Sequence, residues 1–179
     1  KFSGRIESLP GYDEGAWWVQ DAGATLPVQL FGKLDGANVL DVCAAPGGKT
    51  AQLLCGGANV TAIDISKVRI RRLKENLDRL GLKAELIHAD IKKWTTSRSF
   101  DFIFLDAPCS ATGTIRRNPD VLIHKTYEDV QKLSIVQMEI LQKVSKLVRP
   151  GGQLVYCTCS LQYEEGEAQV DRFLSKNTG

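Results

Sequence analysis

Two cysteines of the chain lie in short polar segments that directly follow apolar runs. Cys109 belongs to the segment DAPCS at 106–110, and Cys159 belongs to the segment CTCS at 157–160. A thiolate can add to an electron-poor carbon and form a covalent intermediate that divides one difficult step into easier ones. Both cysteines are therefore candidate nucleophiles, and the residue pattern alone does not choose between them.

The remaining cysteines have simpler interpretations. Cys43 and Cys55 are expected to be small buried apolar side chains. Cys157 would point to the same side of an extended strand as Cys159, which makes oxidation of this pair a hazard. The sequence has no C-x-x-C pair and its two histidines lack ligand spacing, so no metal site is expected.

A catalytic thiol and a bound base both need charged partners. A thiolate requires a pKa below the ordinary cysteine value of about 8.5, and Lys49 is a candidate source of the positive charge that would lower it. Asp106 follows an apolar run and is a candidate acceptor for an exocyclic amine, as in the recognition of base edges. Both residues are therefore predicted to act beside the nucleophile.

A turn of small residues joins the first predicted strand to the helix that follows. Small residues let the backbone approach a ligand closely, and the helix N-terminus that follows is electropositive. The turn does not follow G-x-G-x-x-G, which disfavours a dinucleotide site, and it lacks the first glycine of a P-loop. The predicted ligand-binding residues of this turn are Cys43, Ala44, Ala45, Pro46, Gly47, Gly48 and Lys49.

Two further acidic residues end predicted strands. Asp64 is placed to accept hydrogen bonds from both hydroxyls of a ribose, and Asp90 could hold the amine of an adenine. Each could alternatively be a helix cap or a turn residue, because aspartate favours both positions. Their matching positions at two strand ends favour the ligand-binding interpretation.

The elements that must position these residues alternate along the chain. The predicted strands are 39–45, 59–64, 84–90, 100–107 and 153–158, and the predicted helices are 25–34, 48–55, 67–80, 127–148 and 163–175. Thr25 is expected to cap the first helix, and residues 1–24 form an irregular lead-in. Alternation of this kind is typical of parallel strands joined by right-handed crossovers.

The fold class is therefore a doubly wound, Rossmann-like α/β sheet. Its strands are near-continuous apolar runs, as expected where helices cover both faces. Ligands bind such sheets at the carboxyl ends of the strands. The small-residue turn, the three aspartates and the two cysteines all fall at that edge.

Four segments of the chain resemble the RNA (cytosine-5) methyltransferases of the bacterial Sun/RsmB type. The four segments are VQD at 19–21, DVCAAPGGKT at 41–50, DAPCS at 106–110 with Gly113, and TCS at 158–160. Two further features fit the same family: Asp64 followed by Ser66, Arg69, Leu73 and Asn76, and the segment RNPD at 117–120.

The resemblance implies a reaction and roles for these residues. S-adenosylmethionine would donate a methyl group to carbon 5 of a cytosine in ribosomal RNA, 16S in the bacterial members, after a thiolate adds to carbon 6. It implies that Cys159 is the nucleophile and that Cys109 assists product release. It also implies that Arg69, with the turn and the three aspartates, lines the cofactor and base site.

The resemblance further implies that 1–179 is only a catalytic domain. Family members carry an N-terminal RNA-binding region, and the sheet of the fold usually ends in two strands beyond the last helix. We therefore expect about five strands, in the order 3-2-1-4-5. A DNA or small-molecule methyltransferase, or a non-catalytic cofactor-binding module, remains an alternative.

Composition fits these expectations without identifying a partner. Hydrophobic residues make up 43% of the 179 residues and charged residues 25%, as in globular proteins. The net charge of +2 does not by itself indicate nucleic-acid binding. No apolar run approaches the roughly 20 residues that span a bilayer. We expect a cytoplasmic protein that does not contact a membrane; its oligomeric state is left open.

Overall fold

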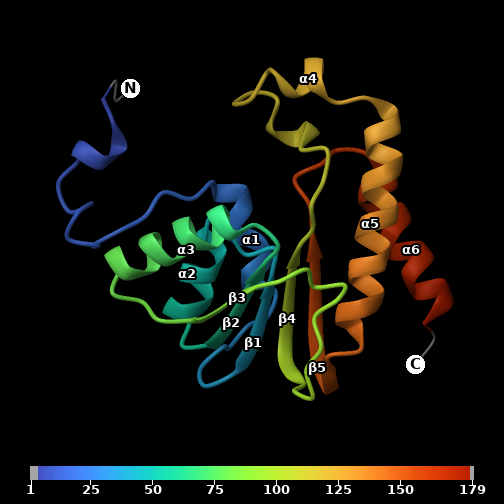
Figure 1. Cartoon of the computed structure of the whole chain (residues 1–179), viewed down its shortest axis with the longest axis horizontal. Coiled ribbons are helices and arrows are strands. Elements are labelled where there is room, and N and C mark those ends of the chain that lie inside the picture. Colours follow the sequence, from blue (N-terminus) through green and yellow to red (C-terminus); the bar gives the residue numbers. More distant parts are fainter. Residues whose placement is uncertain (1–3, 178–179) are drawn as a thin grey trace.

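Five parallel strands form the centre of the structure in the order β3-β2-β1-β4-β5 (Figure 1). The computed structural model describes residues 4–177. The strands are β1 (Asn38–Val42), β2 (Asn59–Asp64), β3 (Glu85–His88), β4 (Phe100–Asp106) and β5 (Val148–Cys157). The predicted doubly wound fold and the predicted strand order are confirmed.

Helices cover both faces of the sheet (Figure 1). On one face lie α1 (Ala22–Gln29), α2 (Gly48–Cys55) and α3 (Lys67–Arg79); on the other lies α5 (Tyr127–Ser145), with α6 (Glu167–Lys176) packed against it. The short elements are η1 (Ile6–Ser8), η2 (Thr112–Thr114), α4 (Val121–His124) and η3 (Tyr163–Glu165). None of the described helices is long and apolar enough to cross a membrane.

Alternating side chains of the strands form two separate apolar layers. Val39 and Phe104 face the first group of helices, whereas Leu40 and Ile103 face α5, and all four are fully buried. A central parallel strand buries both of its faces, because helices cover each side. Because both faces are buried, the central strands can be recognised in the sequence as nearly continuous apolar runs.

The first helix begins earlier than predicted. The sequence suggested Thr25 as its cap, but Asp21 is the N-cap, and its Oδ1 accepts a hydrogen bond from the Gly23 N–H (2.9 Å). Aspartate and threonine are both good caps, and pattern alone did not separate them. The helix therefore begins inside the segment that was predicted to be irregular.

The long helix ends before its predicted end at residue 148. It begins as predicted, with a capping box between Thr126 and Asp129, but it ends at Ser145. The strand β5 then begins at Val148, and its register against β4 shifts between Phe100 and Phe102. The Pro-Gly-Gly sequence that follows is thus an irregularity at the start of the strand rather than the end of the helix.

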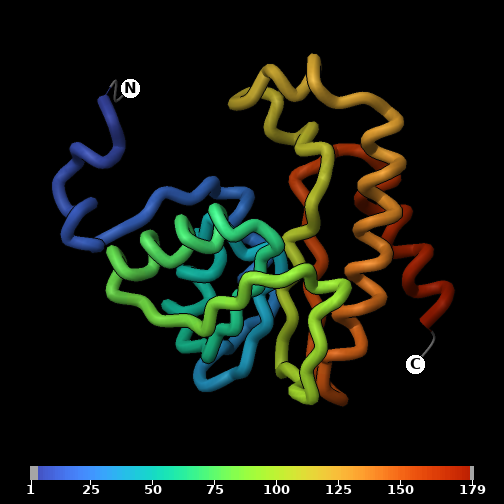
Figure 2. Tube along the Cα trace, viewed as in Figure 1, coloured from blue at the N-terminus to red at the C-terminus, as the bar shows by residue number. Residues whose placement is uncertain are grey.

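Two loops meet above the carboxyl ends of the strands. The loop after β4, yellow-green in Figure 2, runs beside the orange-red loop after β5. The Gly113 N–H donates to the Cys159 carbonyl (2.9 Å), and the Leu161 N–H donates to Thr112 Oγ1 (2.9 Å). These bonds bring the two cysteine segments together, although 50 residues separate them.

Candidate active site

The small-residue turn requires glycine at one position for two reasons. Cys43 directly follows strand β1 and has a left-handed φ of 61°, and Gly47 has a φ of 103°. A Cβ on Gly47 would lie 2.3 Å from Leu73 Cδ1 on α3. The helix therefore packs directly on the turn, and a side chain at Gly47 would force the Leu73 side chain to shift.

Polar side chains of α3 hold the same turn. Arg69 donates to the Ala45 carbonyl, and the Asn76 side chain donates to the Pro46 carbonyl (2.9 Å). Arg69 also lies 3.5 Å from Asp64 Oδ2. The family resemblance implied that Arg69 lines the cofactor site. In the structure Arg69 also anchors the turn, through its hydrogen bond to the Ala45 carbonyl.

A cavity of about 470 Å³ lies beside the turn. Asp64 and Asp90 both line it, together with apolar side chains such as Ile65 and Ile91. Asp64 is nearly fully buried, and its oxygens accept the Ser66 N–H (2.9 Å) and, more weakly, the Ala45 N–H (3.3 Å).

Asp90 Oδ1 accepts the Lys92 N–H in a turn beyond β3 (3.0 Å). Each aspartate is thus both a turn residue and part of the cavity wall, which joins the two interpretations that the sequence left open. A carboxylate oxygen has two lone pairs, so a backbone contact leaves acceptor capacity for a ligand.

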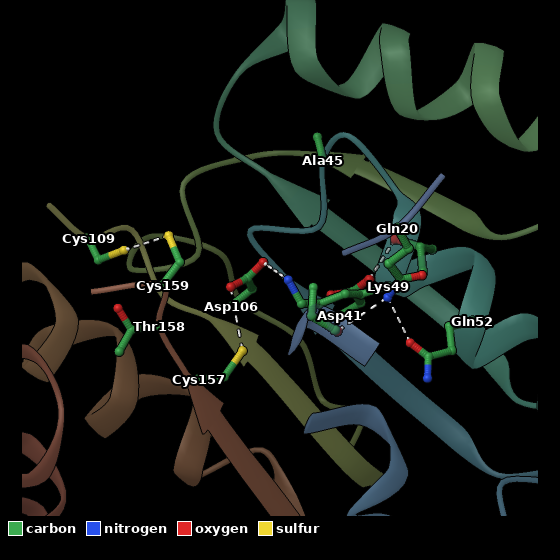
Figure 3. Close-up of polar contacts among 12 residues, drawn as sticks. Gln20, Asp41, Ala45, Lys49, Gln52, Asp106, Cys109, Cys157, Thr158 and Cys159 are labelled. Carbon is green, nitrogen blue, oxygen red and sulfur yellow. Dashed lines mark hydrogen bonds and ion pairs between the residues drawn. The ribbon is translucent and has the colours of Figure 1, made fainter. Parts of the chain in front are cut away.

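Asp106 lies at the end of β4 and forms an ion pair with Lys49. The Lys49 Nζ lies 2.8 Å from Asp106 Oδ2 (Figure 3). Burial by itself lowers the pKa of Lys49, but the charge and hydrogen bond of Asp106 outweigh it and raise the net pKa. Lys49 therefore stays protonated, and its charge is directed at Asp106 rather than at a sulfur as the sequence suggested.

The two candidate nucleophiles are in contact with each other. Their sulfurs lie 3.3 Å apart and face each other beside Asp106 (Figure 3). The hydrogen bond from Cys159 lowers the pKa of Cys109 to about 6, with further help from Thr158 and the Ala111 N–H. The same hydrogen bond raises the pKa of Cys159. Near neutral pH the pair therefore carries one negative charge and one shared proton.

The other thiols near the site stay neutral. Burial, followed by the charge of Asp64, raises the pKa of Cys43 to about 12. Burial and the charge of Asp106 raise the pKa of Cys157, whose sulfur lies 3.5 Å from Asp106 Oδ1. The sulfur nearest Cys159 is that of Cys109 rather than that of Cys157, because β5 ends at Cys157 and the chain turns after it.

Two more cavities adjoin the same centre. One of about 380 Å³ is lined by Cys159, Lys49 and Asp106, and one of about 730 Å³ lies between the turn and the N-terminal segment. Asp106 lines all three cavities. Among the described residues, no group of three or more potential metal ligands occurs.

The structure therefore brings all the predicted residues to one edge of the sheet. Three features were not predicted: the ion pair between Asp21 and Arg117 (3.1 Å), the contacts of Gln20 with α2, and the buried carboxylate of Glu165. The segments 19–21 and 117–120 signalled two of these by resemblance. The sequence contained no local signal for Glu165.

The fold and this edge are those of the Rossmann-like fold class of S-adenosylmethionine-dependent methyltransferases. A methyltransferase homolog protein from Pyrococcus horikoshii has a TM-score of 0.82 and 34% identity, covering 97% of this chain and 56% of that chain. The crystal structure of NSun6 from P. horikoshii with SFG has a TM-score of 0.88 and 32% identity, covering 97% and 46%.

The family model for the 16S rRNA methyltransferases RsmB/F matches residues 28–179, and the chain belongs to this family. Ribosomal RNA small subunit methyltransferase B of Salmonella arizonae is 44% identical over 176 residues, as is that of Vibrio cholerae. Each alignment covers 96% of this chain but 41% of the relative. The chain therefore spans less than half the length of these curated relatives.

Proposed function

We propose that the chain carries the catalytic centre of an enzyme that methylates carbon 5 of a cytosine in ribosomal RNA, through a covalent adduct with Cys159. The observation that supports this most strongly is the meeting of two thiols and Asp106 at one point. All three groups border the cavity beside the small-residue turn, and Asp106 and Cys159 also border the adjoining cavity of about 380 Å³. A ligand in one cavity and a base in the other would meet at Asp106 and Cys159.

The residues of the larger of these two cavities fit S-adenosylmethionine. A volume of about 470 Å³ falls in the range of small-molecule sites. Asp64 and Asp90 offer acceptors for ribose hydroxyls and an adenine amine, and Ile65 and Ile91 offer an apolar wall. When bound, this cofactor supplies a methyl group carried on a sulfonium.

The chain's own residues would activate and hold the base. Asp106 accepts a hydrogen bond from the exocyclic amine of cytosine, and its ion pair with Lys49 keeps it oriented. The Cys159 sulfur forms a bond to carbon 6, which makes carbon 5 electron-rich.

The thiol proton of Cys159 passes to solvent as this bond forms, and Cys109, with a pKa of about 6, remains available as a base. It later accepts the proton of carbon 5 as the bond to Cys159 breaks. Transfer of this proton from Cys109 to the released Cys159 sulfur, 3.3 Å away, restores the pair to its starting state.

Single alanine variants test these roles. Cys159→Ala is expected to abolish methyl transfer while cofactor affinity, measured by calorimetry, is unchanged. Cys109→Ala is expected to accumulate a protein–RNA adduct on denaturing gels, because release from the adduct needs a base. Cys55 provides a matched control: it was expected to be buried, but it is exposed at the end of α2, and Cys55→Ala should behave as wild type. Normal turnover by Cys159→Ala would exclude Cys159 as the nucleophile.

The substrate class is tested by competition between RNA and DNA oligonucleotides of the same sequence. Equal methylation of the DNA would exclude RNA as the specific substrate.

A further inference from the structure

A buried polar cluster lies behind the two thiols. At its centre is Glu165, which has no exposed surface and lies in η3, in the loop region that follows β5. Its Oε1 accepts the Ser110 N–H and the Gln137 side-chain amide, each at 2.9 Å, and its Oε2 accepts the Ser110 hydroxyl. These partners are all neutral, although a buried carboxylate is costly unless it is well hydrogen-bonded.

The cluster fixes the backbone on both sides of Cys109. Gln137, fully buried on α5, donates to the Pro108 carbonyl (2.9 Å) as well as to Glu165. Glu165 accepts the N–H of the residue that follows the cysteine. The peptide groups before and after Cys109 are therefore tied, through two side chains, to α5 and η3.

The same cluster also reaches the loop of the second thiol. The Ser110 hydroxyl lies 3.0 Å from the hydroxyl of Ser160, the residue after Cys159. Ser160 in turn lies 3.2 Å from Thr112 Oγ1. One continuous set of hydrogen bonds thus joins Glu165 to the backbone next to each cysteine.

A strand of the sheet supports the cluster from below. The Tyr156 hydroxyl of β5 donates to the Glu165 carbonyl (2.7 Å) and to Gln137 Oε1 (3.2 Å). Burial, followed by the charge of Cys109, raises the pKa of Tyr156, so this hydroxyl remains a donor. The cluster therefore rests on the rigid part of the fold rather than on the loops alone.

We propose that Glu165 is a positioning residue that holds the two cysteine loops in register and so sets the contact between the Cys109 and Cys159 sulfurs. The proposal deepens the proposed function and rests on it for its catalytic meaning. The geometry argues against a role in stability alone, because an apolar side chain would fill a buried site at lower cost than a carboxylate that has no cationic partner within residues 4–177. Its hydrogen bonds converge instead on the residues that flank the thiols.

The test is the pH dependence of thiol alkylation in Glu165→Gln, read residue by residue with iodoacetamide and mass spectrometry. Apart from Cys159, the titratable groups near Cys109 are Asp106 (paired with Lys49), Tyr156 and Glu165. The same cavity is also lined by the charged groups Asp64, Arg69, Asp90 and Lys92. If the register is lost, the pKa of Cys109 returns from about 6 toward the ordinary value of about 8.5. Alkylation of Cys109 at pH 7 should then slow by up to about 30-fold, which is the loss of thiolate at that pH.

Glu164→Gln is the matched control. Glu164 is the preceding residue, carries the same charge, and contacts the exposed Tyr127 hydroxyl (3.0 Å). This variant should keep the alkylation profile of wild type. A folded Glu165→Gln protein with an unchanged profile would overturn the proposal, since a merely structural role would lower the unfolding temperature and leave the thiols of the folded protein as they were.

A second variant tests the same proposal if Glu165→Gln does not fold. Ser160→Ala removes the link to the Cys159 loop at a half-buried position, and it should shift the alkylation profile of Cys109 in the same direction. An unchanged profile in folded Ser160→Ala would likewise contradict the proposal. Alkylation needs neither RNA nor cofactor, so a wild-type protein that fails to methylate RNA refutes the proposed function without deciding this one.

Discussion

Replacing Asp41 by asparagine should change how the stability of the protein depends on pH. Asp41 lies on β1, is fully buried, and its Oδ2 accepts the Thr50 hydroxyl (2.6 Å). Its Oδ1 is buried with no hydrogen-bond partner among the described residues. Burial is the largest cause that raises the pKa of Asp41 from 3.8 to about 7, and the hydrogen bond of Thr50 only partly opposes it.

The size of this change in stability follows from the difference between the pKa of Asp41 in the folded protein and its pKa in the unfolded chain. In the unfolded chain Asp41 has its usual pKa near 3.8, so between about pH 4 and 7 the folded protein binds a proton that the unfolded chain has lost. The contribution of Asp41 to stability is therefore fully present below pH 3.8 and decreases as the pH rises through about 7. At about 1.4 kcal/mol for each pH unit, the loss amounts to about 4 kcal/mol.

Urea denaturation of wild type and Asp41→Asn between pH 4.5 and 7.5 measures this effect. Asparagine resembles the protonated carboxyl in shape and does not titrate, so the variant should lose less stability than wild type as the pH rises. Other titrating groups, Cys109 among them, cancel in the comparison. Parallel pH profiles of the two proteins would refute the assignment of a protonated Asp41.

Two further predictions concern the turn and the thiols. Gly47→Ala should destabilise the protein by about 1–3 kcal/mol, because of its positive φ and the contact with Leu73, and should weaken S-adenosylmethionine binding in calorimetry. Gly48→Ala is its control for stability, since an added Cβ there meets its nearest neighbour, the Gln20 side chain, at 3.8 Å. Hydrogen peroxide should oxidise Cys109 and Cys159 to a disulfide, with two molecules of water released, and abolish methyl transfer until dithiothreitol is added. Peptide mapping that finds another cysteine pair would contradict this.

Much of the site could be predicted from the sequence because the ends of the strands can be recognised as the ends of apolar runs. Asp64 and Asp106 each follow a continuous apolar run, and parallel strands bring their carboxyl ends to one edge. The turn at 43–49 combined small residues with a helix start. Position in an alternating pattern was therefore enough to collect these residues at one place.

Errors arose where several residues satisfied the same local rule. Asp21 and Thr25 are both acceptable helix caps, and the structure uses the first. The Pro-Gly-Gly sequence after the long helix fits a helix end as well as a strand irregularity, and pairing with β4 decides for the second. In both cases the decision depends on packing against distant elements.

The sequence pattern by itself determined the fold class and the edge at which the functional side chains gather, whereas the strand order was expected from the family resemblance. It did so because apolar periodicity and small-residue turns are local properties of the chain. Only the tertiary structure decided that the Cys109 and Cys159 sulfurs lie 3.3 Å apart, that Lys49 pairs with Asp106, and that a buried carboxylate supports both cysteine loops. These contacts join residues from different loops and helices, and such distances depend on how the whole chain packs rather than on any segment of it.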